Sequence, residues 1–482
     1  MPRRVDTGRI TSERRKLQKC LADGVNLETD VAIVEGQETY PNTVAEKKLG
    51  IFRPPEARKA VVADMERLRA FQEKGLEVPS FMEAGPRAEL RFHPHRVRAA
   101  VVTTGGLAPG LHCVLHAIVK RHTETYGPNT GVFGIYNSFR GLCNLADNHI
   151  RLTSDITEEW LDQGGSHLGI VRYYHNFDET GGDVDDDSRI AAMADVIADN
   201  LRLNNIQILY VIGGDGSLRV VHEVAARCKT RSIVGIPKTM DNDILWVWQS
   251  FGFDTAVEQA TQTINTLRSE AEATRRICLV ELFGAESGFV AANAALASGH
   301  VDVVLIPEVF KELDVNESKA YLEKIVEHIE ETVQDEPHNP HAVVVVAEGV
   351  ETYLEEMGAT IDGEPVQKDE FINLLMRTIS RRVQDPHGEK MPVFINQPRH
   401  YVRAVPANAH DQIYCERLGA LAVDNALAGY TGFMMSQWLT EYVLVPTKLV
   451  IHGQKGIPVN GIFWKQVVSS TRQPLSPAED IS

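Results

Sequence analysis

Residues 206–217 read IQILYVIGGDGS, a largely apolar run that ends in a turn of glycines around one carboxylate. A short apolar run bounded by glycine is typical of a strand that is buried on both faces of a sheet. Similar runs occur elsewhere in the chain: AAVVTT (99–104), RSIVGI (231–236), ICLVEL (277–282), VDVVLI (301–306) and AVVVVA (342–347). Longer stretches with helical patterning separate them, and this alternation predicts a mostly parallel, doubly wound sheet. Ligands of such sheets bind at the carboxyl ends of the strands.

The chain has 482 residues, which exceeds the roughly 250–300 residues at which a single hydrophobic core stops growing. We therefore expect an α/β protein with two doubly wound, Rossmann-like domains of mostly parallel sheet. Residues 1–95 are rich in charge and proline, and we interpret them as an accessory N-terminal extension. Apolar side chains recur at three- and four-residue spacing over residues 61–71, which predicts an amphipathic helix that ends near Gly75. This helix is expected to pack on the main body or on a neighbouring subunit.

The charge balance limits the kinds of partner that we expect the protein to bind. Lysine and arginine number 49 against 66 acidic residues, so the net charge is −17, which argues against binding to nucleic acid or to membrane surfaces. The six cysteines lie far apart and suggest a reducing compartment rather than a zinc or redox motif. The sequence has no run of about 18 apolar residues and no apolar signal core, and acids in the basic opening segment argue against a transit peptide. We expect a cytoplasmic protein.

Three turns after the predicted strands carry the chemistry. The first, TTGGLAPGL (103–111), precedes a helical stretch. Paired glycines and a helix N-terminus together can bind a phosphate, although a tight strand-to-helix connection needs glycine as well. The second, GGDGS (213–217), places one carboxylate among glycines, as a magnesium-phosphate site requires. The same turn is also similar to that of NAD kinases and lipid kinases, so it indicates a kinase without choosing one.

The third turn, IPKTMDND (236–243), has two carboxylates two residues apart beside a lysine and a hydroxyl. Such a group could take the proton of a sugar hydroxyl and stabilise phosphate charge. A turn rich in Asp and Asn with a purely structural role is the alternative.

Together these three motifs resemble the phosphofructokinase family. The resemblance extends over about residues 90–455 and is closest to the long-chain branch of plants and trypanosomatids. It includes these further segments: GGSHLG (164–169) with Arg172, FGFDTA (251–256), SGF (287–289), IPE (306–308) and AEG (347–349). The resemblance implies a nucleotide-binding domain at 96–252 with 403–455, a sugar-phosphate-binding domain at 253–402, and a C-terminal segment at 456–482.

The resemblance also implies roles for individual residues. Asp241 would be the general base, with Asp243, Lys238 and Thr239 beside it, and Arg172 would contact the transferred phosphate. Asp215 would hold Mg²⁺. The positions that match those lining ATP are Gly105, Gly106, Gly213, Gly214, Asp215, Gly216 and Ser217. The positions that match those contacting fructose 6-phosphate are Lys238, Thr239, Asp241, Arg276, Phe283, Gly284, Glu348, His400 and Arg403, with the arginine contributed across a subunit boundary.

The donor prediction rests on one residue. In the family a glycine at position 216 leaves room for the α-phosphate of ATP, whereas pyrophosphate-dependent members have an aspartate there. Gly216 therefore favours ATP, even though Lys238 is usual in pyrophosphate users. We expect an ATP-dependent 6-phosphofructokinase that forms a homodimer or homotetramer.

Three positions depart from the family pattern. Ala285 replaces an arginine that would contact the substrate, Phe394 stands where a basic residue is common, and His112 replaces an asparagine. Losing a cation that neutralises transition-state charge costs several kcal/mol unless another group replaces it. The alternatives are therefore a pyrophosphate-dependent enzyme, a kinase with another sugar-phosphate acceptor, or a regulatory paralogue that binds without turnover.

Overall fold

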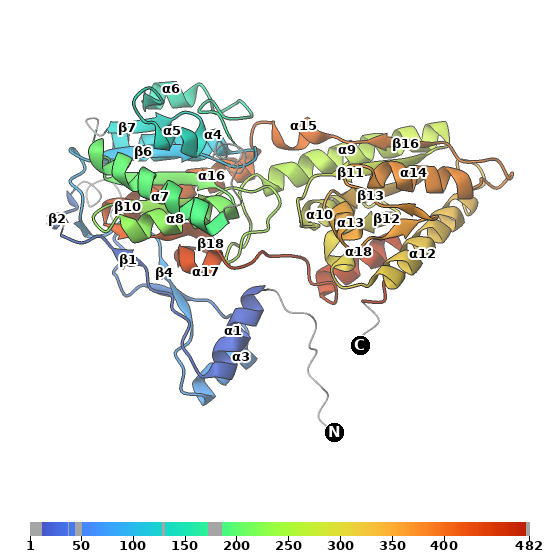
Figure 1. Ribbon diagram of the computed structural model, residues 1–482, viewed down its shortest axis with the longest axis horizontal. Coiled ribbons are helices and arrows are strands. Elements are labelled where there is room, and N and C mark those ends of the chain that lie inside the picture. The colour runs from blue at the N-terminus through green and yellow to red at the C-terminus, as the bar shows by residue number, and fades with distance from the viewer. Residues whose placement is uncertain (1–11, 37, 44–50, 128–130, 172–185, 479–482) are drawn as a thin grey trace.

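The computed structural model describes residues 12–36, 38–43, 51–127, 131–171 and 186–478. Figure 1 shows two lobes side by side along the long axis of the molecule, with a helical arm below the first lobe. Each lobe is built around one sheet. We call the lobe with the larger sheet lobe 1 and the other lobe 2.

The sheet of lobe 1 has nine strands in the order β3-β4-β19-β18-β10-β9-β6-β7-β8. Its strands are β3 (Arg58–Ala60), β4 (Ser80–Glu83), β6 (Arg98–Thr103), β7 (Gly131–Ile135), β8 (His149–Leu152), β9 (Ile208–Gly213), β10 (Ser232–Pro237), β18 (Phe433–Trp438) and β19 (Glu441–Pro446). The neighbours from β18 to β7 pair in parallel, and the outer pairs are antiparallel. The predicted strands AAVVTT, IQILYVI and RSIVGI form the parallel centre, so that prediction is confirmed. The antiparallel edges were not predicted.

Helices cover both faces of this sheet. Helices α5 (Ser138–Cys143), α7 (Asp186–Leu203) and α8 (Asp215–Arg227) share one hydrophobic core with it, and α4 (Leu111–Lys120) and α16 (Ala409–Leu427) share the other. Strands β9 and β10, at the centre, are buried along their whole length. Two covered faces explain why these strands are apolar without alternation.

The sheet of lobe 2 has the order β12-β13-β11-β16, and all of its pairs are parallel. Its strands are β11 (Ile277–Leu282), β12 (Val303–Leu305), β13 (Ala342–Ala347) and β16 (Val393–Asn396). They share one core with α9 (Phe253–Thr274), α10 (Phe289–Ser298), α12 (Val315–Gln334), α14 (Phe371–Arg382) and α18 (Ile462–Thr471). The predicted strands ICLVEL, VDVVLI and AVVVVA are therefore confirmed.

The N-terminal extension joins lobe 1 instead of forming a separate unit. Strand β4 pairs with β19, and β3 pairs with β4. The predicted amphipathic helix is α3 (Met65–Glu73), which starts later than residue 61 because Asp64 caps it by accepting a hydrogen bond from Glu66 N–H at 2.9 Å. Helices α1 (Ser12–Asp23) and α3 form the arm that projects below the body (Figure 1).

Within the part of the chain that the structure describes, the backbone crosses between the lobes three times. Phe251 belongs to a core of lobe 1 and Phe253 to the core of lobe 2, so the first crossing lies at Gly252. Val402 belongs to the core of lobe 2 and Ala407 to a core of lobe 1, so the second crossing lies between these two residues. The third lies between residues 450 and 457, and leads to α18 on lobe 2. The expected domain limits and the ligand assigned to each domain stay predictions.

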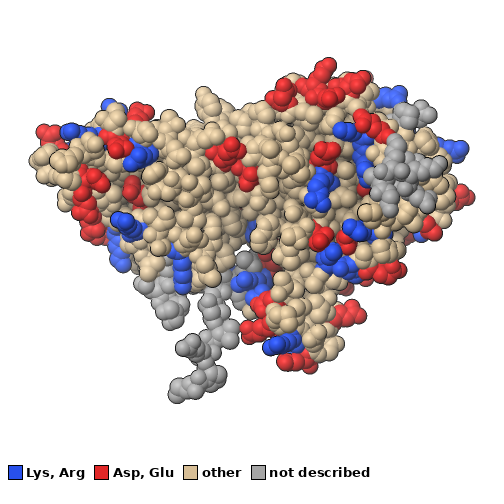
Figure 2. Space-filling model, turned by 180° about the vertical axis from the view of Figure 1, so that it is seen from behind, with Lys and Arg blue, Asp and Glu red and all other residues tan. Residues whose placement is uncertain are grey.

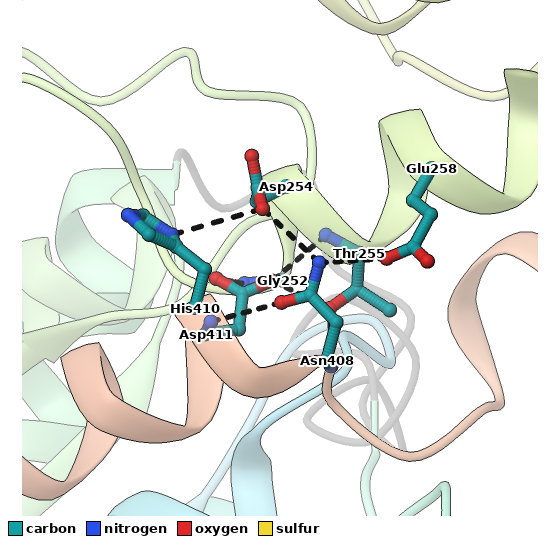
Figure 3. Close-up of polar contacts among 7 residues, drawn as sticks. All are labelled: Gly252, Asp254, Thr255, Glu258, Asn408, His410 and Asp411. Atoms are coloured by element: carbon teal, nitrogen blue, oxygen red, sulfur yellow. Dashed lines mark hydrogen bonds and ion pairs between the residues drawn. The ribbon is translucent and has the colours of Figure 1, made fainter.

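A buried polar cluster joins the first two crossings, as Figure 3 shows. The carboxylate of Asp411, near the start of α16, accepts hydrogen bonds from Gly252 N–H at 3.0 Å and from Thr255 N–H at 2.9 Å. The Thr255 hydroxyl donates to it as well, at 2.6 Å. Asn408, which caps α16, donates from its amide to Asp254 at 3.0 Å. Asp411 thereby binds the N-terminus of α9 and fixes the angle at which that helix leaves lobe 1.

We expect Asp411→Ala to lower the free energy of unfolding by about 3 kcal/mol, because it leaves two buried N–H donors and a hydroxyl unpaired. Denaturant unfolding measures this change. His410→Ala is the matched control: its ring is exposed, lies 3.7 Å from Asp254, and should change stability by less than about 0.5 kcal/mol. Equal stability of the two variants would contradict the structural role of Asp411.

Charged side chains are mixed on the surface. Figure 2 shows acidic and basic residues interspersed on the face opposite to that of Figure 1. No helix among the described residues combines the length and the apolar character needed to cross a bilayer.

Candidate active site

A pocket of about 400 Å³ lies between the lobes, at the carboxyl ends of β6, β9 and β10 on one side and of β11 and β13 on the other. Lobe 1 contributes Gly105, Gly106, Leu107, Gly214, Asp215, Gly216, Ser217, Lys238, Thr239, Met240, Asp241 and Asp243. Lobe 2 contributes Phe283, Gly284, Ala285, Glu348 and Arg403, and Gln454 comes from the third crossing. The side chains of the three predicted turns thus face one cavity.

The glycines of the second turn differ in whether the fold leaves room for a side chain at their positions. A Cβ atom at Gly213 would lie 2.4 Å from Ser217 Oγ and 2.5 Å from Thr104 Cγ2, so glycine is needed there for packing, behind the pocket wall. A Cβ atom at Gly216 would meet no protein atom within 4 Å. The absence of a side chain at 216 therefore leaves the pocket open and is not demanded by the fold.

Asp215 is the first residue of α8, and Gly214 caps that helix. The Asp215 carboxylate is exposed to the pocket, where its Oδ1 accepts from Gly216 N–H at 2.7 Å and its Oδ2 accepts from the Gln454 amide at 3.4 Å. The first turn of α8 also presents backbone N–H groups that have no helical partner. This wall can bind an anion together with its counter-cation.

The third turn follows β10 and is tied to the glycine loops by Lys238. The Lys238 backbone N–H donates to the Gly213 carbonyl at 2.9 Å, and its ammonium group donates to the Gly106 carbonyl. The Asp241 N–H donates to the Thr239 hydroxyl at 3.0 Å. The Oδ1 atoms of Asp241 and Asp243 are buried and accept no hydrogen bond. Two carboxylate oxygens therefore lie buried without a hydrogen-bond partner at the wall of the pocket.

The electrostatics favour protonation of these acids. Burial raises the pKa of Asp241 to about 7, the nearby charge of Asp243 adds to this rise, and the Lys238 ammonium opposes it. Burial also raises the pKa of Asp243, and the charge of Asp215 adds to it. Three carboxylates of like charge therefore lie within range of one another, in a place that a cation or a transferred proton would stabilise.

The wall from lobe 2 is formed by the ends of β11 and β13. The Arg403 guanidinium lies over the Phe283 ring, 4.3 Å from its centroid. Ala285 is exposed and has a φ angle of 47° in the turn after β11. The Ser287 hydroxyl donates to the Asp241 carbonyl at 3.0 Å, which links the two walls.

Some predicted residues lie elsewhere. Arg276 is exposed at the beginning of β11, the end of that strand opposite to the pocket, and His400 is exposed on α15 (Arg399–Arg403). Neither lines the pocket of its own chain. Arg172 lies outside the described residues. His112 packs outside the pocket, where its Nδ1 faces the Gln163 carbonyl at 3.0 Å.

Two residues at the site, Gln454 and Lys455, were not predicted from the sequence. Gln454 lines the pocket, and the Lys455 N–H donates to the Asp243 carbonyl at 2.7 Å. The segment HGQKGI (452–457) has no residue pattern that marks a site, and its only signal is the pair of glycines around the two residues.

Comparison with known proteins places this geometry in one family. The family model described as phosphofructokinase matches residues 98–426. A curated relative, an ATP-dependent 6-phosphofructokinase from Borreliella burgdorferi, is 35% identical over 82% of this chain and 85% of its own. The ATP-dependent 6-phosphofructokinase 7 of Arabidopsis thaliana is 34% identical over 82% of this chain and 77% of its own.

Solved structures share the fold. The phosphofructokinase of Saccharomyces cerevisiae aligns with a TM-score of 0.57 at 21% identity, over 74% of this chain and 45% of the yeast chain. A pyrophosphate-dependent phosphofructokinase from Marinobacter aquaeolei aligns with a TM-score of 0.59 at 17% identity, over 79% of this chain and 92% of its own.

Proposed function

Because the chain belongs to the phosphofructokinase family, we propose that it is an ATP-dependent 6-phosphofructokinase, which transfers the γ-phosphate of ATP to the 1-hydroxyl of fructose 6-phosphate. One observation carries the proposal. The pocket brings Asp241, a carboxylate with one unpaired oxygen and a pKa that burial raises to about 7, between two glycine-rich phosphate loops and the wall of lobe 2. The curated relatives at 34–35% identity bear the same activity in their names.

The donor would bind along lobe 1. Gly105, Gly106 and Gly214 keep the backbone open to phosphate oxygens, and the N-terminus of α8 would face the same anion. Gly216 leaves the space that the α-phosphate of ATP needs. We therefore prefer ATP to pyrophosphate as donor.

The family implies Mg²⁺, and the residues present fit it. Mg²⁺ is usually held by one or two carboxylates together with phosphate oxygens and water. Asp215 and the buried, unpaired oxygen of Asp243 supply such a pair in the pocket. When bound there, the cation would neutralise phosphate charge. Among the described residues, no cluster of three or more acids, histidines or cysteines forms a complete protein cage.

Proton transfer would fall to Asp241. Its free Oδ1 can accept the proton of the attacking hydroxyl, and a pKa near the working pH suits a general base. Lys238 and Thr239 hold the turn that carries it. We also retain Arg172 as a proposed contact of the transferred phosphate.

The acceptor would bind against lobe 2. Glu348 lines the pocket and would accept hydrogen bonds from sugar hydroxyls, and Arg403 would contact the 6-phosphate. Arg276, which is exposed and does not line its own pocket, would serve the pocket of a neighbouring subunit in a homodimer or homotetramer. We propose that the protein works in the cytoplasm.

Ala285 favours a second candidate, a kinase of this family with a different sugar-phosphate acceptor. It lies in the pocket with a methyl side chain where family members carry an arginine. A spectrophotometric assay of ADP release, run with a panel of sugar phosphates, separates the two candidates. ATP-dependent turnover with fructose 6-phosphate supports the main proposal, and turnover only with pyrophosphate or only with another sugar phosphate would refute it.

We expect kcat/KM to fall as the pH drops through about 7. Asp241 must be ionised to accept a proton, and its raised pKa means that the active form is lost on the acid side of that value. Asp243→Asn removes one of the charges that raise the pKa of Asp241, so the acid limb of the remaining activity should move to lower pH. Burial, the larger cause, remains and keeps the limb well above pH 4. A limb that stays in place or moves upward would contradict the coupling.

A further inference from the structure

The loop that follows the proposed general base is buried and strained. Asn242 and Trp246 have φ angles of 54° and 62°, in the left-handed region that residues other than glycine rarely adopt. Trp246 is fully buried, with its ring edge-on to Phe81 at 5.5 Å between centroids. Such a conformation persists only where the surroundings hold it in place. Residues 242–248, called the catalytic loop here, therefore need specific anchors.

Lys455, from the third crossing between the lobes, is one anchor. Its ammonium group donates to the Asn242 side-chain oxygen at 2.8 Å and to the carbonyls of Val247 and Trp248 at 2.7 and 3.2 Å. Its backbone N–H donates to the Asp243 carbonyl at 2.7 Å. One residue thus binds both ends of the catalytic loop.

Glu13, in the first turn of α1, is the other anchor. Its side chain is buried, with 8% of its surface exposed, and its carboxylate accepts a hydrogen bond from the Trp246 N–H at 2.7 Å. Helix α1 belongs to the N-terminal extension, more than 200 positions before the catalytic loop in the sequence. Helix α1, which is part of the extension interpreted as accessory from the sequence, therefore contacts the middle of the catalytic loop.

The two anchors complement one another. The Glu13 carboxylate accepts a hydrogen bond from a backbone N–H of the catalytic loop, and the Lys455 ammonium group donates to backbone carbonyls of the same loop. Each charged group therefore forms charge-assisted hydrogen bonds with backbone groups of opposite polarity. The charges also influence each other: burial lowers the pKa of Lys455 to about 8, and the negative charges of Glu13 and Asp243 oppose this effect. Removing either anchor leaves buried polar groups of the loop without a partner.

We propose that Glu13 and Lys455 are positioning residues for the phosphoryl transfer, which hold the catalytic loop so that Asp241 and Asp243 face the reacting groups. This inference rests on the proposed function, because it concerns the efficiency of that reaction. It assigns a catalytic purpose to the N-terminal extension and to the third crossing. Neither residue lines the pocket, so substrate binding itself should not depend on them.

The experiment compares steady-state kinetics of full-length variants with ATP and fructose 6-phosphate. Glu13→Met keeps the volume but removes the acceptor, and Lys455→Met removes the donor. Each should lower kcat by about 10- to 100-fold with the KM of ATP and of the sugar phosphate changed less than about 3-fold, since small misplacements of catalytic groups cost this much. Glu13→Gln keeps an acceptor oxygen and should restore kcat to within about 3-fold of the wild type.

Lys16→Met is the matched control. Lys16 lies one turn further along α1 and donates to the Leu449 carbonyl at 2.6 Å. The ring N–H of Trp246 donates to the same oxygen at 3.1 Å, and Lys16→Met leaves that bond and the backbone anchors of the catalytic loop in place. It should weaken the attachment of the helix but leave kcat close to the wild-type value. If Glu13→Met does not fold, the kcat and KM values of Lys455→Met test the inference, with the same expected changes.

Unchanged kcat in the two Met variants, a loss confined to KM, or an equal loss of kcat in Lys16→Met would overturn the inference. A wild-type chain without ATP-dependent turnover of fructose 6-phosphate would instead refute the proposed function, so the two failures are distinguishable.

Discussion

Asp241→Asn is expected to lower kcat by about 10³-fold and, at the same time, to make the protein more stable at pH 8. The loss of rate follows from the role of Asp241 as proton acceptor, since general bases contribute about 10²–10⁴-fold. The amide keeps the shape of the side chain but cannot take the proton. The gain in stability follows from the environment of the carboxylate, which is buried near two other acids and whose Oδ1 has no hydrogen-bond partner.

The sign of the stability change depends on pH. The folded state holds Asp241 with a pKa of about 7, above the ordinary value of 3.8, so ionisation costs the folded state free energy. This cost grows as the pH rises from about 4 to about 7 and stays constant above. At about 1.4 kcal/mol per pKa unit, and allowing for relaxation of the site, the Asn variant should gain about 2 kcal/mol at pH 8 and nothing near pH 4.

Denaturant unfolding at the two pH values and kinetics at pH 8 measure both effects. Asp302→Asn is a suitable control, because burial also raises the pKa of Asp302, which lies outside the pocket and accepts a hydrogen bond from Val343 N–H at 2.7 Å. It should retain full activity. An Asp241→Asn enzyme with wild-type kcat would exclude Asp241 as the base.

The sequence predicted the centre of each sheet and the location of the pocket for one physical reason. Strands buried on both faces must be apolar throughout, so β9 and β13 stand out, and the carboxyl ends of neighbouring parallel strands meet at one edge. The turns beginning at Gly213 and Pro237 therefore had to converge, and Asp215 and Asp241 do line one pocket. Local patterns of this kind can be recognised in the sequence without knowledge of contacts between distant residues.

The rest depends on contacts that no local pattern records. Strands β18 and β19 pair antiparallel with each other, and β4 and β3 of the N-terminal extension complete that edge. Lys455 reaches Asn242 across 213 positions, and Glu13 reaches Trp246 across 233. Such pairs are set by the tertiary path of the chain, and the charges at Glu13 and Lys455 look like ordinary surface charges in the sequence.

The family resemblance also assigned to the site some residues that lie far apart within one chain. Arg276 directly precedes β11 and Phe283 directly follows it, so the six residues of the strand separate them by about 20 Å. The prediction that an arginine crosses a subunit boundary is compatible with this separation and stays a prediction. Ala285 stays a departure that the structure does not explain.

Gly216→Asp is expected to abolish most of the activity with ATP, by about 10²–10³-fold in kcat/KM, while the protein remains folded. A Cβ atom at 216 meets no protein atom within 4 Å, so the fold accommodates a side chain there. The carboxylate would instead project into the pocket beside Asp215, where the triphosphate would lie. Juxtaposed like charges in such a site cost several kcal/mol, which corresponds to this loss of rate.

Gly216→Asn separates charge from size, because the amide has the same shape without the negative charge. If repulsion dominates, the Asn variant should retain roughly ten times more ATP-dependent activity than the Asp variant; if the α-phosphate is excluded by volume, both should lose it equally. Pyrophosphate has no α-phosphate to exclude, so the Asp variant should lose relatively little of any activity measured with pyrophosphate. An Asp variant as active with ATP as the wild type would show that the donor does not pass over residue 216, and the donor assignment would then lose its structural support.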